Sequence, residues 1–182
     1  MRKIYLDHNA TTPLLQEVLD EMLPLYKDGF GNPSSVHSEG RVARVRLDEA
    51  REQVAEFIGA QPSEIVFTSG GSESNNFAIL GVAFAPDNKK RHIVTCEVEH
   101  AAILNPLKQL EGLGFQVERL PVDDVGRVDP ERVQNSLTES TALVTIQHAN
   151  SEVGTLQNID KIGGYVREKG ILFHTDAVQS VG

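Results

Sequence analysis

Cysteine is nearly absent from this sequence. The 182 residues contain a single one, Cys96. A single cysteine excludes a disulfide bond within the chain, and it fits a reducing compartment. The cysteine content therefore favours a cytoplasmic protein.

Long apolar runs and an excess of positive charge are also lacking. No run approaches the roughly 18 consecutive apolar residues that a membrane span requires, and residues 1–7 reach a charge before a signal-peptide core could form. Acidic side chains outnumber basic ones by 26 to 17, which gives a formal net charge of -9. Because phosphate binding requires a basic face, we expect neither a membrane nor a nucleic acid as a partner.

The sequence does contain a regular alternation of strand and helix patterns. Short apolar runs predict strands, and apolar residues at helical spacing predict helices between them. The predicted strands are residues 4–6, 65–67, 93–96, 117–120, 142–146 and 171–174, and the predicted helices contain residues 15–26, 43–57, 77–84, 103–110, 130–137 and 159–166. Such alternation indicates an α/β fold, with a mostly parallel sheet and helices on both faces.

Ligands of such sheets bind at the carboxyl ends of the strands, and the first polar loop there spans residues 68–76. Gly71 allows a ligand to approach the backbone closely, and free N–H groups at the start of a helix favour an anion. The hydroxyl groups of Ser69 and Ser72 add possible donors. The loop has neither a P-loop lysine nor the G-x-G-x-x-G spacing. A phosphate site is therefore one interpretation, and an N-capped helix after a tight turn is the other.

Three further loops carry polar side chains of interest. His100 could stack on a flat ring or cap a helix, and no second ligand at a suitable spacing indicates a metal site. Asn150 could orient a substrate or satisfy its own turn. Asp176 follows a predicted buried strand, where a carboxylate needs a cationic partner. A protonated pyridine nitrogen would serve as that partner, although a helix-capping aspartate is the alternative.

Taken in order, these motifs resemble those of the cysteine desulfurases of the nitrogen-fixation and iron–sulfur-cluster type. That family depends on pyridoxal 5'-phosphate (PLP) and belongs to the class-V aminotransferases. The matching segments are residues 5–13, 30–37, 68–76, 98–100, 150–155 and 174–182. The resemblance implies an incomplete large domain of PLP fold type I. It assigns residues 1–15 to the small domain and residues 16–182 to the large, PLP-binding domain.

The resemblance also implies roles for individual residues toward PLP. Gly71 and Ser72 would bind the phosphate, although many relatives have Ala-Thr at these two positions. His100, the one catalytic residue assigned, would stack on the pyridine ring, and Asp176 would pair with the ring nitrogen. The residues that would contact the phenolic oxygen of the ring are Asn150, which would also orient the substrate, and Gln179.

The family's Schiff-base lysine, its sulfur-accepting cysteine and its substrate-binding arginine have no counterpart in these 182 residues. Cys96 lies on a predicted strand and is expected to be a packing residue, inert because it is buried. We therefore expect no activity from the chain alone, and any PLP would be held without a covalent bond.

For the whole enzyme, the resemblance implies conversion of L-cysteine to L-alanine with a persulfide on the enzyme. It also implies a homodimer and an iron–sulfur scaffold, or another sulfur acceptor, as a protein partner. One alternative is another PLP enzyme of the same fold, such as a selenocysteine lyase or an aminotransferase. A second alternative is a non-catalytic chain that binds PLP or a partner, for example one half of a split enzyme.

Overall fold

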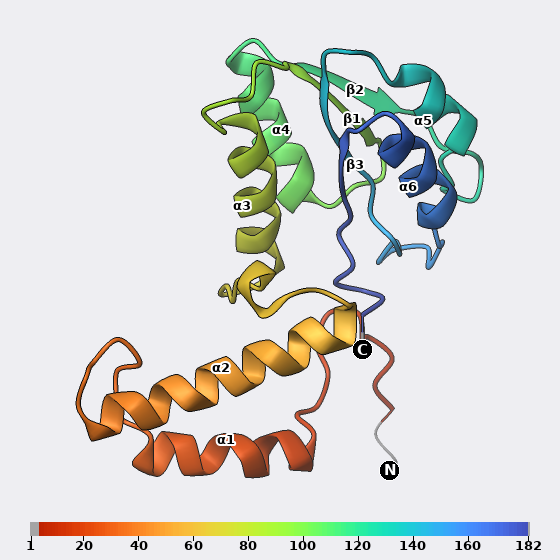
Figure 1. The fold of residues 1–182 in the computed structure, drawn as a ribbon. Coiled ribbons are helices and arrows are strands. Elements are labelled where there is room, and N and C mark those ends of the chain that lie inside the picture. Colours follow the sequence, from red (N-terminus) through yellow and green to blue (C-terminus); the bar gives the residue numbers. More distant parts are fainter. Residues whose placement is uncertain (1–3, 182) are drawn as a thin grey trace. The chain divides into compact units, whose positions relative to one another are not determined.

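The computed structural model describes residues 4–181, which fall into two compact units (Figure 1). The helical unit ends at Phe67 and the sheet unit begins at Thr68. The domain division after residue 15 that the resemblance implies stays a prediction.

The helical unit contains two long helices and one turn of 3-10 helix. Their bounds are Gln16–Asp28 for α1, Ser38–Ile58 for α2 and Pro62–Glu64 for η1. At the start of α2, the ring nitrogen Nδ1 of His37 accepts a hydrogen bond from the backbone N–H of Gly40. The helix ends at Gly59, whose φ of 69° is left-handed and suits a residue without a Cβ. In α1 no residue is buried, and in α2 only Gly40 and Ala55 are.

Two predicted strands of this unit are not strands in the structure. Residues 4–6 and 65–67 belong to no helix or strand, and they are mostly exposed, as Leu6 at 89% and Val66 at 58% show. A strand exists only when a neighbouring strand accepts and donates its backbone hydrogen bonds. Within residues 4–181 no strand pairs with either segment. An apolar composition alone was therefore not enough to make these segments strands.

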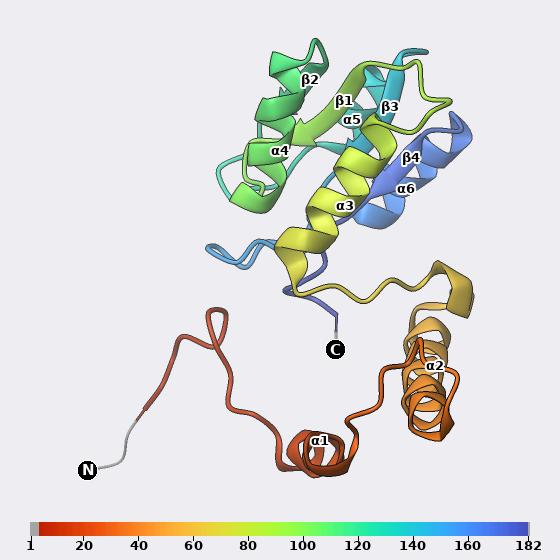
Figure 2. The ribbon, with the colours of Figure 1, turned by 90° about the vertical axis from the view of Figure 1, so that its left-hand side faces the viewer.

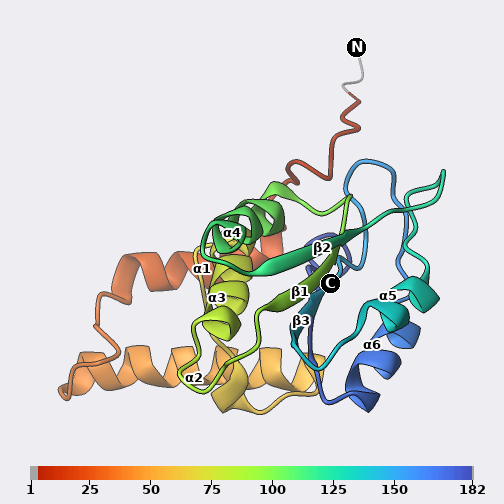
Figure 3. The same cartoon turned by 90° about the horizontal axis from the view of Figure 1, so that it is seen from above.

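The sheet unit is built on four parallel strands, as predicted. Their bounds are His92–Cys96 for β1, Gln116–Leu120 for β2, Thr141–Thr145 for β3 and Leu172–His174 for β4. The order across the sheet is β2-β1-β3-β4, so β1 and β3 form the centre (Figure 3). Val94 pairs with Glu118 on one side and with Val144 on the other, and Val144 pairs in turn with Phe173.

Four helices cover the two faces of the sheet. They are α3 (Gly71–Ala83), α4 (Ala101–Gly112), α5 (Pro130–Ser136) and α6 (Ile159–Glu168). Helices α3 and α4 lie on one face, and α5 and α6 lie on the other (Figures 2 and 3). The predicted end of the last helix is confirmed, because Gly170, with a φ of 63°, stops α6. No helix in the described part of the chain is long and apolar enough to cross a membrane.

The alternation of side chains along β1 and β3 divides the core into two layers. Ile93 and Leu143 pack with the residues of α3 and α4, whereas Val94 and Val144 pack with those of α5 and α6. All five residues of each central strand are buried. Burying one such aliphatic side chain stabilises a fold by about 1.5–3 kcal/mol. The core therefore holds the central strands in place, and with them the loops at their ends.

Candidate functional site

The carboxyl edge of the sheet, where the strands end, brings the candidate loops together. From β1 the chain crosses outward to β2, and from β3 it crosses outward to β4, so the topology reverses between β1 and β3. Such a reversal is where open α/β sheets bind ligands. The loops after β1 and β3 are joined there, because the Val98 carbonyl accepts hydrogen bonds from Gln147 Nε2 at 2.7 Å and from Asn150 Nδ2 at 3.1 Å.

The first candidate element is the amino end of α3. Glu73 Oε2 accepts hydrogen bonds from both the backbone N–H and the hydroxyl of Ser69, each at 2.6 Å. These bonds hold the pKa of Glu73 below its usual range. A Cβ on Gly71 would lie 2.8 Å from Val178 Cγ2. The absence of a side chain at Gly71 therefore allows Val178 to pack closely against the start of α3. Ser72 follows with an exposed side chain, and the first-turn N–H groups of this helix suit an anion.

Asp176 lies just beyond β4, close to the same helix. Its Oδ2 accepts a hydrogen bond from Asn75 Nδ2 at 2.8 Å, and its Oδ1 accepts one from the Val178 backbone N–H at 3.0 Å. Its carbonyl accepts from the backbone N–H of His148 at 2.9 Å. Each carboxylate oxygen has a further lone pair, so a ring N–H can still be accepted here.

His100 is the N-cap residue of α4, whose first turn contacts α3 through Asn76. Its Nδ1 accepts the backbone N–H of Ala102 at 3.1 Å, so the ring caps the helix. Asn76 Nδ2 reaches the Ala102 carbonyl at 3.5 Å and joins the two helices at this level. The cap uses only the edge of an exposed ring. Capping therefore leaves the ring face available for stacking.

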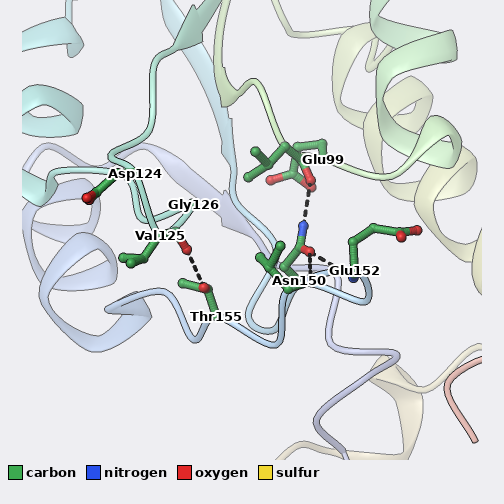
Figure 4. A pocket seen from close by; sticks show the side chains of 9 residues that line it. Glu99, Asp124, Val125, Gly126, Asn150, Glu152 and Thr155 are labelled. Atoms are coloured by element: carbon green, nitrogen blue, oxygen red, sulfur yellow. Dashed lines mark hydrogen bonds between the residues drawn. The ribbon is translucent and has the colours of Figure 1, made fainter. Parts of the chain in front are cut away.

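Asn150 satisfies its own turn, as the simpler interpretation of its loop expected. Its Oδ1 accepts the backbone N–H groups of Glu152 and Val153 at 2.9 and 3.0 Å (Figure 4). Its Nδ2 donates to Val98, and one amide hydrogen is left over. Gln179 lies three residues beyond Asp176 with an exposed side chain. The roles of Asn150 and Gln179 toward a cofactor stay predictions.

A cavity of about 630 Å³ opens beside Asn150, between the loops that follow β1, β2 and β3 (Figure 4). It is lined by Val98, Glu99, Asp124, Val125, Gly126, Asn150, Glu152, Val153 and Thr155. Thr155 Oγ1 donates to the Val125 carbonyl and Gln157 Nε2 donates to the Gly126 carbonyl, so the loop after β2 is fixed to the loop after β3.

The sequence did not single out Asn75, which the structure places in contact with Asp176. Asn75 is 4% exposed and lies in line with Ile79 and Ala83 on the buried face of α3. The sequence did contain a signal, because Asn75 precedes Ile79 by four positions and Ala83 by eight, which is the spacing of one helix face. Such a residue needs a partner inside the fold, and the partner is Asp176.

Cys96 is a buried packing residue, as predicted. It is 0% exposed, and its thiol donates to Glu99 Oε1 at 3.1 Å. Burial, reinforced by Glu99, raises the pKa of the Cys96 thiol well above its usual value. The thiolate, which is the nucleophile, is therefore disfavoured. In the described residues, no group of three His, Cys, Asp or Glu side chains could hold a metal ion.

The residues at this edge fit PLP. Hydrogen bonds join α3 to Asp176 and to α4, so the candidate phosphate, ring-nitrogen and ring-face groups converge. The start of α3 offers N–H groups and a hydroxyl to a phosphate, Asp176 keeps free lone pairs for a ring N–H, and the face of His100 is open.

Comparison with known proteins identifies the family of the chain. The family model for class-V aminotransferases matches residues 4–182. A cysteine desulfurase IscS from Dictyoglomus turgidum is 52% identical over 181 residues, which are 100% of this chain and 46% of that protein. A putative cysteine desulfurase IscS 1 from Bacillus subtilis is 50% identical over 182 residues, which are 100% of this chain and 48% of that protein.

Solved structures give the same result. A NifS-like protein aligns with a TM-score of 0.94 and 41% identity, over 98% of this chain and 50% of that one. SspA in complex with cysteine aligns with a TM-score of 0.92 and 44% identity, over 97% of this chain and 51% of that one. The chain thus spans about half the length of these relatives. It belongs to the class-V aminotransferase family, and it is similar throughout to the IscS and NifS cysteine desulfurases.

Proposed function

We propose that this chain forms the PLP-binding part of a cysteine desulfurase, which converts L-cysteine to L-alanine and passes the sulfur to a protein thiol. The observation that carries the proposal is the convergence of the α3 amino end, His100 and Asp176 at one edge of the sheet. The identity of about 50% to proteins named cysteine desulfurase supports the choice of reaction.

Each group at the edge has a task in this proposal. Bound PLP supplies an electron-withdrawing ring that stabilises negative charge at the α-carbon of an amino acid. Gly71 and Ser72 bind the phosphate through backbone N–H and hydroxyl groups, and His100 packs on the ring face. Asp176 holds the proton on the ring nitrogen, and the hydrogen bond from Asn75 keeps its carboxylate in place.

The remaining candidates act at the other side of the ring. Asn150 offers its second amide hydrogen to the phenolic oxygen and helps to orient the substrate, and Gln179 contacts the same oxygen. Cys96 does not take the sulfur, because its thiol is buried and its raised pKa disfavours the thiolate. We also propose that the whole enzyme is a homodimer in the cytoplasm. Its protein partner is an iron–sulfur scaffold or another sulfur acceptor.

PLP titration of the purified chain, followed by absorbance, tests the cofactor. We expect saturable, non-covalent binding that is weakened in Asp176→Ala. No desulfurase activity is expected from the chain alone. Absence of saturable binding would contradict the assignment of the site.

A chimera tests the reaction. Residues 1–182 would replace the matching half of the Bacillus subtilis relative, and sulfide release from L-cysteine would be measured. We expect activity that depends on Asp176. Preference for L-selenocysteine, or amino-group transfer without sulfide, would identify one of the other PLP enzymes. A chimera that binds PLP and is inactive on all these substrates would favour a non-catalytic binding chain.

A further inference from the structure

Glu99 is a buried carboxyl group to which the proposed function assigns no task. It lies between Val98, which the loop after β3 contacts, and His100, which caps α4. Only 6% of its surface is exposed. Acidic residues are rarely buried to this degree unless they are paired, so its contacts require an explanation.

Both hydrogen bonds of Glu99 go to one oxygen. Oε1 accepts the backbone N–H of Gln147 at 2.7 Å and the thiol of Cys96 at 3.1 Å. Gln147 in turn donates its side-chain amide to the Val98 carbonyl at 2.7 Å. The loop after β1 and the loop after β3 are therefore joined by reciprocal hydrogen bonds. Glu99 supplies one half of this joint and Gln147 supplies the other.

The second oxygen of Glu99 indicates its protonation state. Oε2 is buried and has no hydrogen-bond partner in residues 4–181, and no cationic side chain there forms a salt bridge with Glu99. The titratable groups that act on it are Cys96 and Asp176, and the other carboxylates that line the cavity are Asp124 and Glu152. An ionised carboxylate in such surroundings is costly.

The pKa of Glu99 agrees with this geometry. Burial is the main cause that raises the pKa of Glu99 to about 7; the hydrogen bonds from Gln147 and Cys96 oppose this rise, and the nearby Asp176 charge adds a smaller increase. Below pH 7 the neutral acid predominates; it still accepts the Gln147 and Cys96 hydrogen bonds at Oε1, which leaves Oε2 to carry the proton. It adds no second negative charge beside Asp176.

We propose that Glu99 is a positioning residue which, as the neutral acid, locks the loop of His100 to the loop of Asn150. This inference rests on the proposed PLP site for its functional consequence, and on the hydrogen bonds alone for the joint itself. Without the Glu99 half of the joint, the Val98 carbonyl still holds this loop to the loop after β3, but the start of α4 gains freedom to shift. The capping ring of His100 would shift with it.

The experiment compares the chain with Glu99→Gln, Glu99→Leu and the matched control Glu97→Gln, an exposed glutamate of the same loop. Two readouts are taken. The first is the amide NMR signals of Gln147 and Ala102 in the ¹⁵N-labelled chain without PLP. The second is the dissociation constant for PLP, measured by absorbance titration.

We expect Glu99→Gln and Glu97→Gln to keep both amide signals and to bind PLP within about threefold of the wild-type chain, because glutamine retains a neutral acceptor. In Glu99→Leu the Gln147 signal should lose its hydrogen-bond shift, the Ala102 signal should move, and PLP binding should weaken about tenfold or more.

Two results would overturn the inference. One is an unmoved Ala102 signal in Glu99→Leu, which would show that the carboxyl does not position His100. The other is a Glu99→Gln variant as impaired as Glu99→Leu, which would show that the ionised form is needed. If no variant binds PLP, wild type included, the proposed function fails, and the amide signals still decide whether the joint exists.

Discussion

At the amino edge of the sheet, where the strands begin, the buried histidine has a partner for each ring nitrogen. His92 is 7% exposed; its Nδ1 lies 2.9 Å from Thr141 Oγ1 and its Nε2 lies 3.4 Å from Glu118 Oε2. At the carboxyl edge, three buried side-chain oxygens have no partner in the described part of the chain. They belong to Thr95, Glu99 and Thr175.

The difference fits our proposal of a structural amino edge and a PLP-binding carboxyl edge. Folded proteins pair nearly all buried polar groups, and an exception calls for an explanation such as a ligand or a catalytic role. The amino edge meets this rule with its own side chains. The carboxyl edge, where we place PLP, leaves polar atoms unpaired. Four experiments test this contrast.

The largest effect is expected from Asp176→Ala in the chimera. Removing the carboxylate that holds the ring-nitrogen proton should lower turnover by about 10²–10³-fold, the range found for other preorganised electrostatic groups. Asp87→Ala, which alters an exposed turn, is the control. Comparable sulfide release from the two variants would place the functional edge elsewhere.

The pH dependence of stability should reveal the raised pKa of Glu99. Its pKa is about 7 in the fold against 4.5 for a glutamate side chain in water, so the native state holds the proton more tightly than the unfolded chain between these values. Stability from this group is therefore present at low pH and is lost as pH rises through 7. The loss is on the order of 3 kcal/mol, since one pKa unit is worth about 1.4 kcal/mol.

Urea unfolding at pH 5 and pH 8 measures this loss. The wild-type chain should lose stability relative to Glu99→Gln between the two pH values. The difference between the variants removes the contribution of His174, whose pKa burial lowers. A constant difference would mean that Glu99 titrates normally.

At the amino edge, Thr141→Val should reduce stability without affecting PLP. The variant removes the partner of His92 Nδ1 and the acceptor of the Thr138 backbone N–H. Leaving the buried His92 ring nitrogen unpaired costs about 1–3 kcal/mol. Ser140→Ala, at an exposed neighbour, is the control. A change in PLP affinity at matched folded fraction would show that the two edges are not independent.

The smallest effect is expected from Gly71→Ala, although Gly71 belongs to the proposed phosphate site. The new Cβ meets only the end of the Val178 side chain, which is 64% exposed and can turn away. We expect a cost below about 1 kcal/mol, as for other tolerated substitutions, and PLP affinity within about threefold. Adding Val178→Ala to the Gly71→Ala variant should remove the remaining loss of stability.

The sequence predicted the sheet unit well because its signals are local. Strands β1, β3 and β4 are short, mainly apolar runs, β2 carries Val117 and Leu120 among polar residues, and apolar residues recur at helical spacing in α3 to α6. The segments 4–6 and 65–67 have the same apolar composition and failed, because a strand also depends on a partner that composition does not reveal. Strand formation in these two segments depends on contacts with residues that are distant in the sequence.

The candidate site was predicted in part for the same reason. Motif order singled out Asp176 and His100, and the structure brings their loops to one edge. The contacts of Asn75 with Asp176 and of Glu99 with Gln147 join residues 101 and 48 positions apart. Such pairs follow from strand order, which no single motif encodes.

The last strand has a consequence for handling the protein. β4 lies at the border of the sheet, and in residues 4–181 only β3 pairs with it. Its outer backbone groups form an open row, and its first residue, Leu172, is 57% exposed. Unpaired strand borders recruit extended segments from other molecules. We therefore expect concentrated samples of the chain to self-associate through β4, and we expect Leu172→Lys to reduce this association.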